Sequence, residues 1–598
     1  MTYIHDLFEF FKKTGKYFRD VLWLHTFLVV LLIPFVVFVF RNFLQANTIY
    51  YLSNDNLLSI IIQKPFVAFA ILLFFLFVVG IFYFQFNYLI IATYCIELKK
   101  RIGILTLVKL TLRQFKKIRL GYTSFILFYF FLLLPIIGQS SRMDIISNIK
   151  IPAFILDFIF TNRVQFVVSF VLFYILCLYL ALRLIYTLPL VTLKDMRLRE
   201  AVKKSFEVTK KNFFRLTLTF LGVLLVLFLF FAISIFFLIL LQMHIELNVP
   251  NISLLSGSLI MTVVQFITLI NIVLSTIAYF FVLVRHLDKI GELPPFPETI
   301  KIKNVPSRKG RIIKRAILVL SAGILTAIVV QYNQGFLKEN DMPIPETFSH
   351  RGVTRGVGVQ NTIPALENVH RYAPDYVEMD IQYTKDKQFV LMHDGNLKNL
   401  CGVNKTVHQL TLKEMTALTA SEHHQSAPVP SFDAYLQKAN ALHQKLLIEL
   451  KIYVPYDEKM VDDFVEKYHD NIIKNGHHIH SLSYPIIERI KEIAPDLNCS
   501  FILPFNIIGP PISHTNAFTM EYSTLNSGFV KSAHHDGKKV LAWTVNDMDS
   551  IERMRSFDVD GIITDDMQTL NQEIKEAPLK MKYSEKILIY STGRDVAE

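Results

Sequence analysis

Long uncharged apolar runs dominate the first 330 residues of this chain. A helix that spans a bilayer needs about 20 mostly apolar residues. Seven runs reach or approach that length: Val21–Phe40, Phe66–Phe86, Tyr122–Ile137, Phe166–Leu188, Leu216–Leu241, Leu259–Val284 and Ala316–Val330. The third and the last of these runs are short. A series of uncharged runs predicts a multi-pass α-helical membrane domain over residues 1–330 rather than the buried helices of a soluble protein.

The pattern changes after a short segment, residues 331–346, that contains Pro343 and Pro345 and is predicted to be a linker. From residue 347 to 572, short apolar runs alternate with stretches of helical periodicity. This alternation predicts a parallel sheet with helices on its outside. Residues 573–598 form a charged tail for which the pattern predicts no role.

The positive charges of the membrane part are concentrated in alternate connections. Lys and Arg gather near the N-terminus and in Lys99–Arg119, Lys194–Lys211 and Lys289–Arg315, whereas the intervening connections hold few. Since Lys and Arg accumulate on the cytoplasmic side, the N-terminus is predicted to be cytoplasmic. An odd number of spans then places everything after Val330 outside the cell. The same loops account for the net charge of +12, so no nucleic-acid partner is expected.

Two candidate strands carry charged groups on one face. Glu378 and Asp380 alternate with apolar residues, and Glu449 and Lys451 do so in a later run. Two further strand ends carry His350-Arg351 and His393. A hydrophobic core would not select this set, because unpaired buried charges are costly. Carboxylates, imidazoles and cations that converge on one interior predict a site for a metal ion and an anionic substrate.

These motifs closely resemble those of the glycerophosphodiester phosphodiesterase family. The family pattern is present as His350-Arg351-Gly352, Glu378/Asp380, Thr384/Asp386, His393/Asp394 and Glu449/Lys451. The resemblance covers roughly residues 346–572 and implies a TIM barrel. The segment Lys194–Phe206 is also similar to part of the membrane domain that precedes the barrel in some bacterial members. One position departs from the family, because Gln360 stands where a glutamate is usual.

A barrel has eight places, but nine candidate strands end at His350, Thr384, His393, Lys451, Ser483, Leu503, Thr524, Val545 and Thr564. Only a tight turn separates Tyr383 from Val390, whereas a parallel crossover needs about a dozen residues. The run that ends at His393 is therefore predicted to pair as a hairpin. Residues 396–432 are then an insertion over the barrel mouth.

Phosphodiester cleavage requires neutralised phosphoryl oxygens, a base for the nucleophile and an acid for the leaving oxygen. The residues and the resemblance together suggest four roles. His350 and His393 are the candidate acid–base pair, with the base left open. The candidate ligands of Ca²⁺ or Mg²⁺ are the carboxylates of Glu378, Asp380 and Glu449. The candidate phosphate contacts are Arg351 and Lys451. Trp543 is either a glycerol-facing wall or a core residue.

The leading hypothesis is a membrane-anchored, outward-facing enzyme that hydrolyses glycerophosphodiesters to sn-glycerol 3-phosphate and an alcohol. A glycerophosphate polymer such as teichoic acid, or a lysophospholipid headgroup, is an alternative substrate. A lipid-handling membrane protein with an accessory barrel is the alternative from another class. The other histidine groups are expected to lie on the surface: His423-His424, His477-His478 with His480, and His534-His535.

Overall fold

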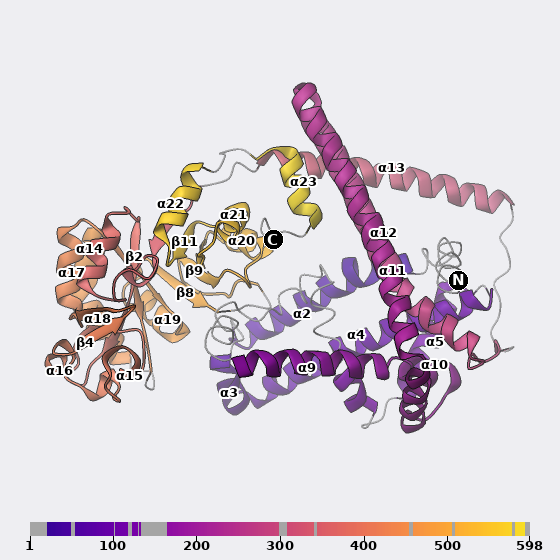
Figure 1. Ribbon diagram of the computed structural model, residues 1–598, viewed down its shortest axis with the longest axis horizontal. Helices are drawn as coiled ribbons and strands as arrows, with labels where there is room; N and C mark the ends of the chain where they lie inside the picture. The colour runs from indigo at the N-terminus through magenta and orange to yellow at the C-terminus, as the bar shows by residue number, and fades with distance from the viewer. Residues whose placement is uncertain are drawn as a thin grey trace.

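The computed structural model describes residues 21–24, 26–49, 54–100, 102–117, 122–129, 131–132, 164–297, 308–339, 344–453, 458–504, 509–576 and 581–592. Figure 1 shows two parts, a helical part formed by the N-terminal half and a barrel surrounded by helices at the other end of the molecule. The fold class expected from the sequence, a helical membrane domain followed by an α/β barrel, is thereby confirmed.

The described helices of the first part follow the apolar runs. They are α2 (Ile33–Ala46), α3 (Asn54–Gln63), α4 (Pro65–Glu97), α5 (Ile104–Gln114), α9 (Val164–Arg183), α10 (Thr187–Lys194), α11 (Leu198–Asn248), α12 (Ser253–Lys289) and α13 (Arg308–Glu339). Among the described residues, four segments are long and apolar enough to cross a membrane: Pro65–Glu97, Val171–Lys194, Leu198–Asn248 and Pro250–Lys289. These four correspond to the second, fourth, fifth and sixth apolar runs.

The remaining three runs stay predictions as spans. The first forms a π-helical turn, Phe27–Leu32, followed by the short apolar helix α2. The third run, Tyr122–Ile137, is described only as far as residue 132, and its remainder lies outside the described residues. The seventh lies within α13, which continues to Glu339, so that most of the expected linker is helical. This extension has a local reason, because neither proline of the segment lies before residue 343.

Helices α11 and α12 form a long antiparallel hairpin that crosses α4 and α9 at a steep angle in Figure 1. The 51 residues of α11 extend for about 76 Å, more than twice the thickness of a bilayer's hydrocarbon core. Its first turns, which contain the basic residues from Arg199 to Lys211, bury Ala201 and Ser205 against the helical core. Further along, Phe228 and Phe237 remain more than 60% exposed. Such rings suit contact with lipid.

Eight parallel strands form the closed barrel, in the order β1, β11, β10, β9, β8, β7, β6, β2, with β1 also paired to β2. They are β1 (Glu346–Ser349), β2 (Tyr376–Tyr383), β6 (Lys445–Leu450), β7 (His478–Ser481), β8 (Cys499–Leu503), β9 (Ala517–Glu521), β10 (Lys539–Trp543) and β11 (Gly561–Thr564). The ninth strand, β3 (Phe389–Leu391), pairs antiparallel with β2. The predicted hairpin is therefore confirmed.

The barrel core has two layers. Most buried apolar side chains lie between the strands and the surrounding helices, which are α14 (Ile363–His370), α17 (Phe432–Ala441), α18 (Glu458–Asn475), α19 (Tyr484–Ile493), α20 (Ser527–His535), α21 (Met548–Ser556) and α22 (Met567–Glu576). A smaller cluster inside the barrel contains Phe348 and Tyr376, whose rings stack at 4.8 Å. Gly561 makes room for it, since a Cβ there would lie 2.5 Å from the Phe348 ring.

The insertion expected between residues 396 and 432 is present and folds as a unit of its own. It contains α15 (Lys398–Cys401), α16 (Leu412–Thr416) and the hairpin of β4 (Thr419–Glu422) with β5 (Gln425–Pro428). A separate group of buried apolar residues, including Leu397, Val407 and Met415, holds it together and attaches it to Val390 and Met392. The insertion is therefore fixed beside the strand end that carries His393.

The charged tail returns to the helical part. Helix α23 (Tyr583–Thr592) lies against α11, α12 and the end of α13, as Figure 1 also shows. The backbone nitrogen and hydroxyl of Ser584 donate to Glu246 at 2.8 and 2.7 Å, and Lys586 Nζ donates to the Leu337 carbonyl at 2.8 Å. Ile587 is fully buried there. Helix α23 thus attaches the tail that follows the barrel to the helical part.

Candidate active site

Two histidines lie at the carboxyl ends of the strands, and an aspartate holds each through Nδ1. His350 directly follows β1, and its Nδ1 lies 2.7 Å from Oδ1 of Asp565, which directly follows β11. His393 follows β3, and its Nδ1 lies 2.8 Å from Oδ1 of Asp394. Because a carboxylate accepts the proton of Nδ1, the Nε2 atom of each ring remains for other chemistry.

The environment of the first pair favours an ion pair. Burial alone would raise the pKa of Asp565, but the charge and the hydrogen bond of His350 lower it to about 2. Burial alone would lower the pKa of His350, yet Asp565 and Glu378 outweigh this effect and raise it. Asn546 supports the arrangement, because its Nδ2 donates to Asp565 Oδ2 at 2.9 Å.

The loop that carries His393 is held by two polar side chains. Gln382 Nε2 on β2 donates to the carbonyl oxygens of Met392, His393 and Asp394 at 2.8, 3.2 and 2.9 Å. The hydroxyl of Tyr453 donates to the His393 carbonyl at 2.7 Å. Tyr453 was not among the residues singled out from the sequence, because it lies in the loop after β6, where no strand alternation marks it.

The three carboxylates expected to hold a metal are buried side by side inside the barrel mouth: Glu378 and Asp380 from β2, and Glu449 from β6. Lys451 Nζ lies 2.8 Å from Glu449 Oε1 and 3.2 Å from Asp380 Oδ1. Arg351 donates its backbone N–H to Glu378 at 2.8 Å and places Nε 3.6 Å from Asp380. Two cations therefore face three carboxylates, which leaves an excess of negative charge.

The pKa values of these carboxylates differ because their partners differ. Burial opposes ionisation of Asp380, but Lys451 and Arg351 outweigh it and hold its pKa well below the usual range. Burial raises the pKa of Glu449 despite the nearby Lys451, because Asp380 adds negative charge. A further cation would relieve this repulsion. The donor set thus fits a divalent cation, and Asp380 Oδ1 accepts no hydrogen bond within the described structure.

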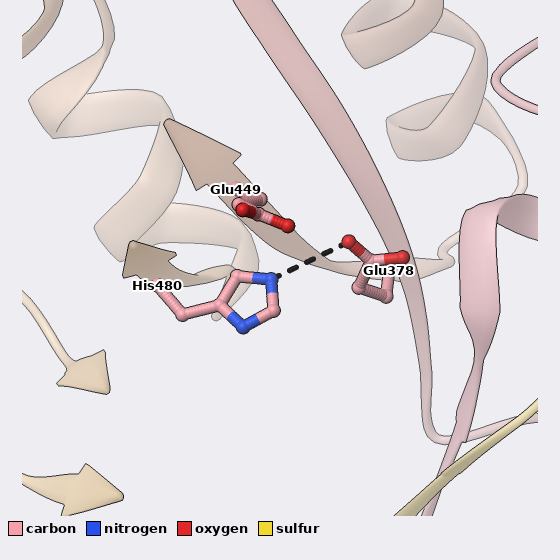
Figure 2. Close-up of side chains that lie close together, drawn as sticks. All are labelled: Glu378, Glu449 and His480. Atoms are coloured by element: carbon pink, nitrogen blue, oxygen red, sulfur yellow. Dashed lines mark ion pairs between the residues drawn. The ribbon is translucent and has the colours of Figure 1, made fainter. Parts of the chain in front are cut away.

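A histidine that was expected on the surface lies among these carboxylates. His480 on β7 is 2% exposed, and its Nε2 lies 3.5 Å from Glu378 Oε1, as Figure 2 shows. Ligand atoms of Glu378, Glu449 and His480 all lie within 4.8 Å of one another. The surface expectation was wrong for this residue and for His477, which is also 2% exposed.

The reason is the alternation of β7, which turns every second residue into the barrel. His477 instead lies at the strand's start, where its Nδ1 accepts from the Leu446 N–H at 3.0 Å. His423, His424 and His535 are exposed as expected. The alternation His478-Ile479-His480-Ser481 was the signal in the sequence that could have placed His480 inside.

Gln360, the departure from the family pattern, lies between Arg351 and the insertion. Its Oε1 accepts from Arg351 at 2.8 Å, and its Nε2 donates to Glu422 Oε1 at 2.8 Å. An amide can accept and donate at once, whereas a carboxylate could not donate to Glu422. Glu422, at the end of β4, thus places a carboxylate next to Gln360.

Trp543 ends β10 and is half-buried. Its indole packs against the cluster inside the barrel and donates Nε1–H to the Thr519 carbonyl at 3.3 Å. The indole of Trp543 therefore packs in the core of the barrel, and its contact with glycerol stays a prediction. Of the other predicted residues, His350 and Arg351 follow β1, His393 follows β3, and Glu449 and Lys451 lie at the carboxyl end of β6. Glu378 and Asp380 lie within β2.

Comparison with known proteins covers nearly the whole chain. Residues 3–328, more than half of the 598, match the family model for the membrane domain of glycerophosphoryl diester phosphodiesterase. Residues 350–569 match the glycerophosphoryl diester phosphodiesterase family. YhdW of Bacillus subtilis is 28% identical over 232 residues, which cover 36% of this chain and 93% of YhdW.

Two further relatives match the barrel part. A glycerophosphodiester phosphodiesterase of Caldanaerobacter subterraneus is 26% identical over 235 residues, which cover 37% of this chain and 94% of that protein. A phosphodiesterase of Oleispira antarctica, solved with the product sn-glycerol-3-phosphate, is 19% identical and covers 39% of this chain and 98% of its own, with a TM-score of 0.35. With the two family matches, the chain belongs to the glycerophosphoryl diester phosphodiesterase family, as a membrane enzyme that hydrolyses glycerophosphodiesters.

Proposed function

We propose that the enzyme cleaves glycerophosphodiesters at the outer face of the membrane, with a divalent cation and with His350 and His393 as the acid–base pair. The products are sn-glycerol 3-phosphate and an alcohol. Residues 347–572 are the catalytic domain in this proposal, and residues 1–330 anchor it. The observation that carries the proposal is the pair of aspartate-held imidazoles, His350 with Asp565 and His393 with Asp394, near the buried carboxylates.

Each histidine can exchange a proton at Nε2, because its Nδ1 is engaged by an aspartate. One imidazole accepts the proton of the nucleophile, which is water or a hydroxyl of the substrate's glycerol. The other donates a proton to the leaving alkoxide oxygen. Bell-shaped dependence on pH is expected for such a pair.

Arg351 and Lys451 bind and neutralise the phosphate diester. The planar guanidinium of Arg351 can form two hydrogen bonds to phosphoryl oxygens, and Lys451 contributes a compact positive charge. Both cations are already oriented by Asp380, at 3.6 and 3.2 Å. They therefore need little rearrangement when an anionic substrate arrives.

Glu378, Asp380 and Glu449 would hold the divalent cation. Their buried, partly uncompensated negative charge supports this assignment. Asp380 Oδ1 is paired with Lys451 Nζ at 3.2 Å but accepts no hydrogen bond within the described structure. When bound, such a cation supplies Lewis-acid stabilisation of the phosphoryl oxygens and orients the substrate. Hard carboxylate oxygens suit Ca²⁺ and Mg²⁺.

The outward orientation rests on the distribution of Lys and Arg between the connections. A barrel outside the cell would meet glycerophosphate polymers of the envelope and lysophospholipid headgroups, in addition to small glycerophosphodiesters. All three substrates contain the same glycerophosphate unit, so the residues above serve each of them.

The test uses the full-length protein in detergent micelles with glycerophosphocholine, a glycerophosphate polymer and a lysophospholipid as parallel substrates. Release of sn-glycerol 3-phosphate, or of lysophosphatidic acid from the lysophospholipid, is measured with Ca²⁺, with Mg²⁺ and with a chelator. His350→Gln and His393→Gln should each lower kcat by about a hundredfold or more. His424→Gln, an exposed histidine, is the matched control. Full activity in chelator, or near-normal activity of both variants, would contradict the proposal.

A further inference from the structure

We infer that His480 is a ligand of the divalent cation, so that the site binds through nitrogen as well as oxygen and prefers Mn²⁺ to Ca²⁺. The inference rests on the metal dependence proposed above and concerns which residues of this chain hold the ion. It begins from the register of the barrel strands. Asp380 is paired with Glu449 across β2 and β6, and Glu449 is paired with His480 across β6 and β7.

Register partners in neighbouring strands of a sheet project to the same side. Asp380, Glu449 and His480 therefore form one row across three adjacent strands, and Glu378 lies two residues before Asp380 on the first of them. Figure 2 shows the His480 ring turned toward the carboxylates of Glu378 and Glu449. The position of His480 is thus set by the barrel and not by a loop.

The buried ring nitrogens of His480 require a hydrogen-bond partner or a metal ion. The side chain is 2% exposed, yet neither ring nitrogen forms a hydrogen bond within the described structure. Its nearest charged atom is Glu378 Oε1, 3.5 Å from Nε2. Buried polar atoms are nearly always hydrogen-bonded, and a metal ion is one of the partners that explains an exception. The other buried histidine of this strand region, His477, does have partners, Leu446 and Asn440.

The spacing matches an ion at the centre of the cluster. Ligand atoms of Glu378, Glu449 and His480 lie within 4.8 Å of one another. Bonds from divalent ions to protein oxygen and nitrogen are about 2.0–2.6 Å, so two ligands on opposite sides of an ion lie about 4–5 Å apart. One ion can therefore reach all three residues.

The donor chemistry sets the preference among ions. Ca²⁺ and Mg²⁺ take oxygen ligands almost exclusively, whereas imidazole suits first-row transition metals. If Glu378, Glu449 and His480 bind the ion, the carboxylate of Asp380 either stays with its present partners, Arg351, Lys451 and Asn361, or binds the same ion. Among the ions that carboxylate oxygens suit, Mn²⁺ is the first-row transition metal, and it is the ion with which we test the inference.

The experiment is pulsed EPR of the full-length protein in detergent, stripped with a chelator and reloaded with Mn²⁺. A ¹⁴N coupling from a directly bound imidazole should be present in the wild type and absent in His480→Gln. His478→Gln, on the same strand but two residues from the cluster, should keep it. If His480→Gln does not fold, the double variant His350→Gln with His393→Gln tests the same inference. It removes the other two imidazoles of the candidate site, so it should retain the ¹⁴N coupling if His480 is the ligand.

Metal titration gives a second readout. His480→Gln should weaken Mn²⁺ affinity on the order of ten- to a hundredfold and change Ca²⁺ affinity far less. Bound Mn²⁺ without a ¹⁴N coupling, or a coupling that persists in His480→Gln, overturns this inference and leaves the proposed metal site standing. Absence of any Mn²⁺, Mg²⁺ or Ca²⁺ binding to the wild type overturns both. Equal losses for Mn²⁺ and Ca²⁺ overturn the preference.

Discussion

Nδ1 of His350 lies 2.7 Å from Oδ1 of Asp565, across 215 positions of sequence. The two residues meet because the barrel closes between its first and last strands, where Ser349 is paired with Thr564. Each residue is the next one after its strand. The seam that closes the barrel therefore also aligns one imidazole of the candidate active site.

Asp565→Asn should keep the shape of this contact and lose its charge. Asp565 contributes to the raised pKa of His350, so its removal should lower that pKa, and the pH–rate limb of His350 should move to lower pH. We expect kcat to fall by about a hundredfold or more, with KM little changed. Asp566→Asn is the control, because its carboxylate contacts Arg355 instead. An unchanged pH limb in Asp565→Asn would show that the aspartate does not tune the histidine.

Lys451→Met should make the protein depend on a divalent cation for stability. The substitution leaves Asp380 and Glu449 buried without their shared cation, a loss of about 3 kcal/mol or more in the free energy of unfolding. A bound divalent cation replaces part of that charge. The Tm of Lys451→Met should consequently rise more on addition of Mg²⁺ or Mn²⁺ than the wild-type Tm does. Equal shifts in the two proteins would mean that the ion binds elsewhere.

Gln360→Glu, which restores the residue usual in the family, should lower activity here. The amide of Gln360 now donates a hydrogen bond to Glu422 at 2.8 Å. A carboxylate at the same position would instead repel Glu422. Glu422→Gln in the same chain should recover most of the loss. A double-mutant cycle on kcat/KM and Tm measures this coupling, and purely additive effects would contradict the role assigned to Glu422.

Ile587→Ala should loosen the C-terminal helix without unfolding the barrel. Ile587 is fully buried between α23 and the ends of α11 to α13, so its truncation should cost the docking of α23 roughly 2–5 kcal/mol. Leu588→Ala is the matched control, since that neighbour is 41% exposed. Faster proteolytic removal of a C-terminal tag in Ile587→Ala than in the control is the expected result. Equal rates would indicate that α23 is not held by this contact.

Protease added to intact protoplasts should remove the barrel and leave the basic connections, such as Lys194–Lys211, uncut. The reason is the cytoplasmic preference of Lys and Arg, which places residues 346–572 outside. Antibodies against tags in the barrel and in that connection report the fragments. If the barrel resists protease until the membrane is permeabilised, it is cytoplasmic, and small imported glycerophosphodiesters become the substrates.

The sequence alone determined the two-part architecture, because each part depends on local periodicity. Uncharged runs of bilayer length predict helices in lipid, and alternating runs predict strands with helices around them. The hairpin of β3 also followed locally, since Tyr383 and Val390 are too close along the chain for a parallel crossover. The motifs around His350, Glu378, His393 and Glu449 could also be recognised from the sequence, because each of them is a short local segment.

Only the tertiary structure decided which distant residues meet. Asp565 reaches His350 through barrel closure, Glu422 reaches Gln360 through the folded insertion, and α23 reaches α11 through the return of the tail. His480 was assigned to the surface because a histidine has no fixed preference for burial, whereas strand register decides which way it faces. Register and closure are properties of the whole sheet, so no window of sequence contains them.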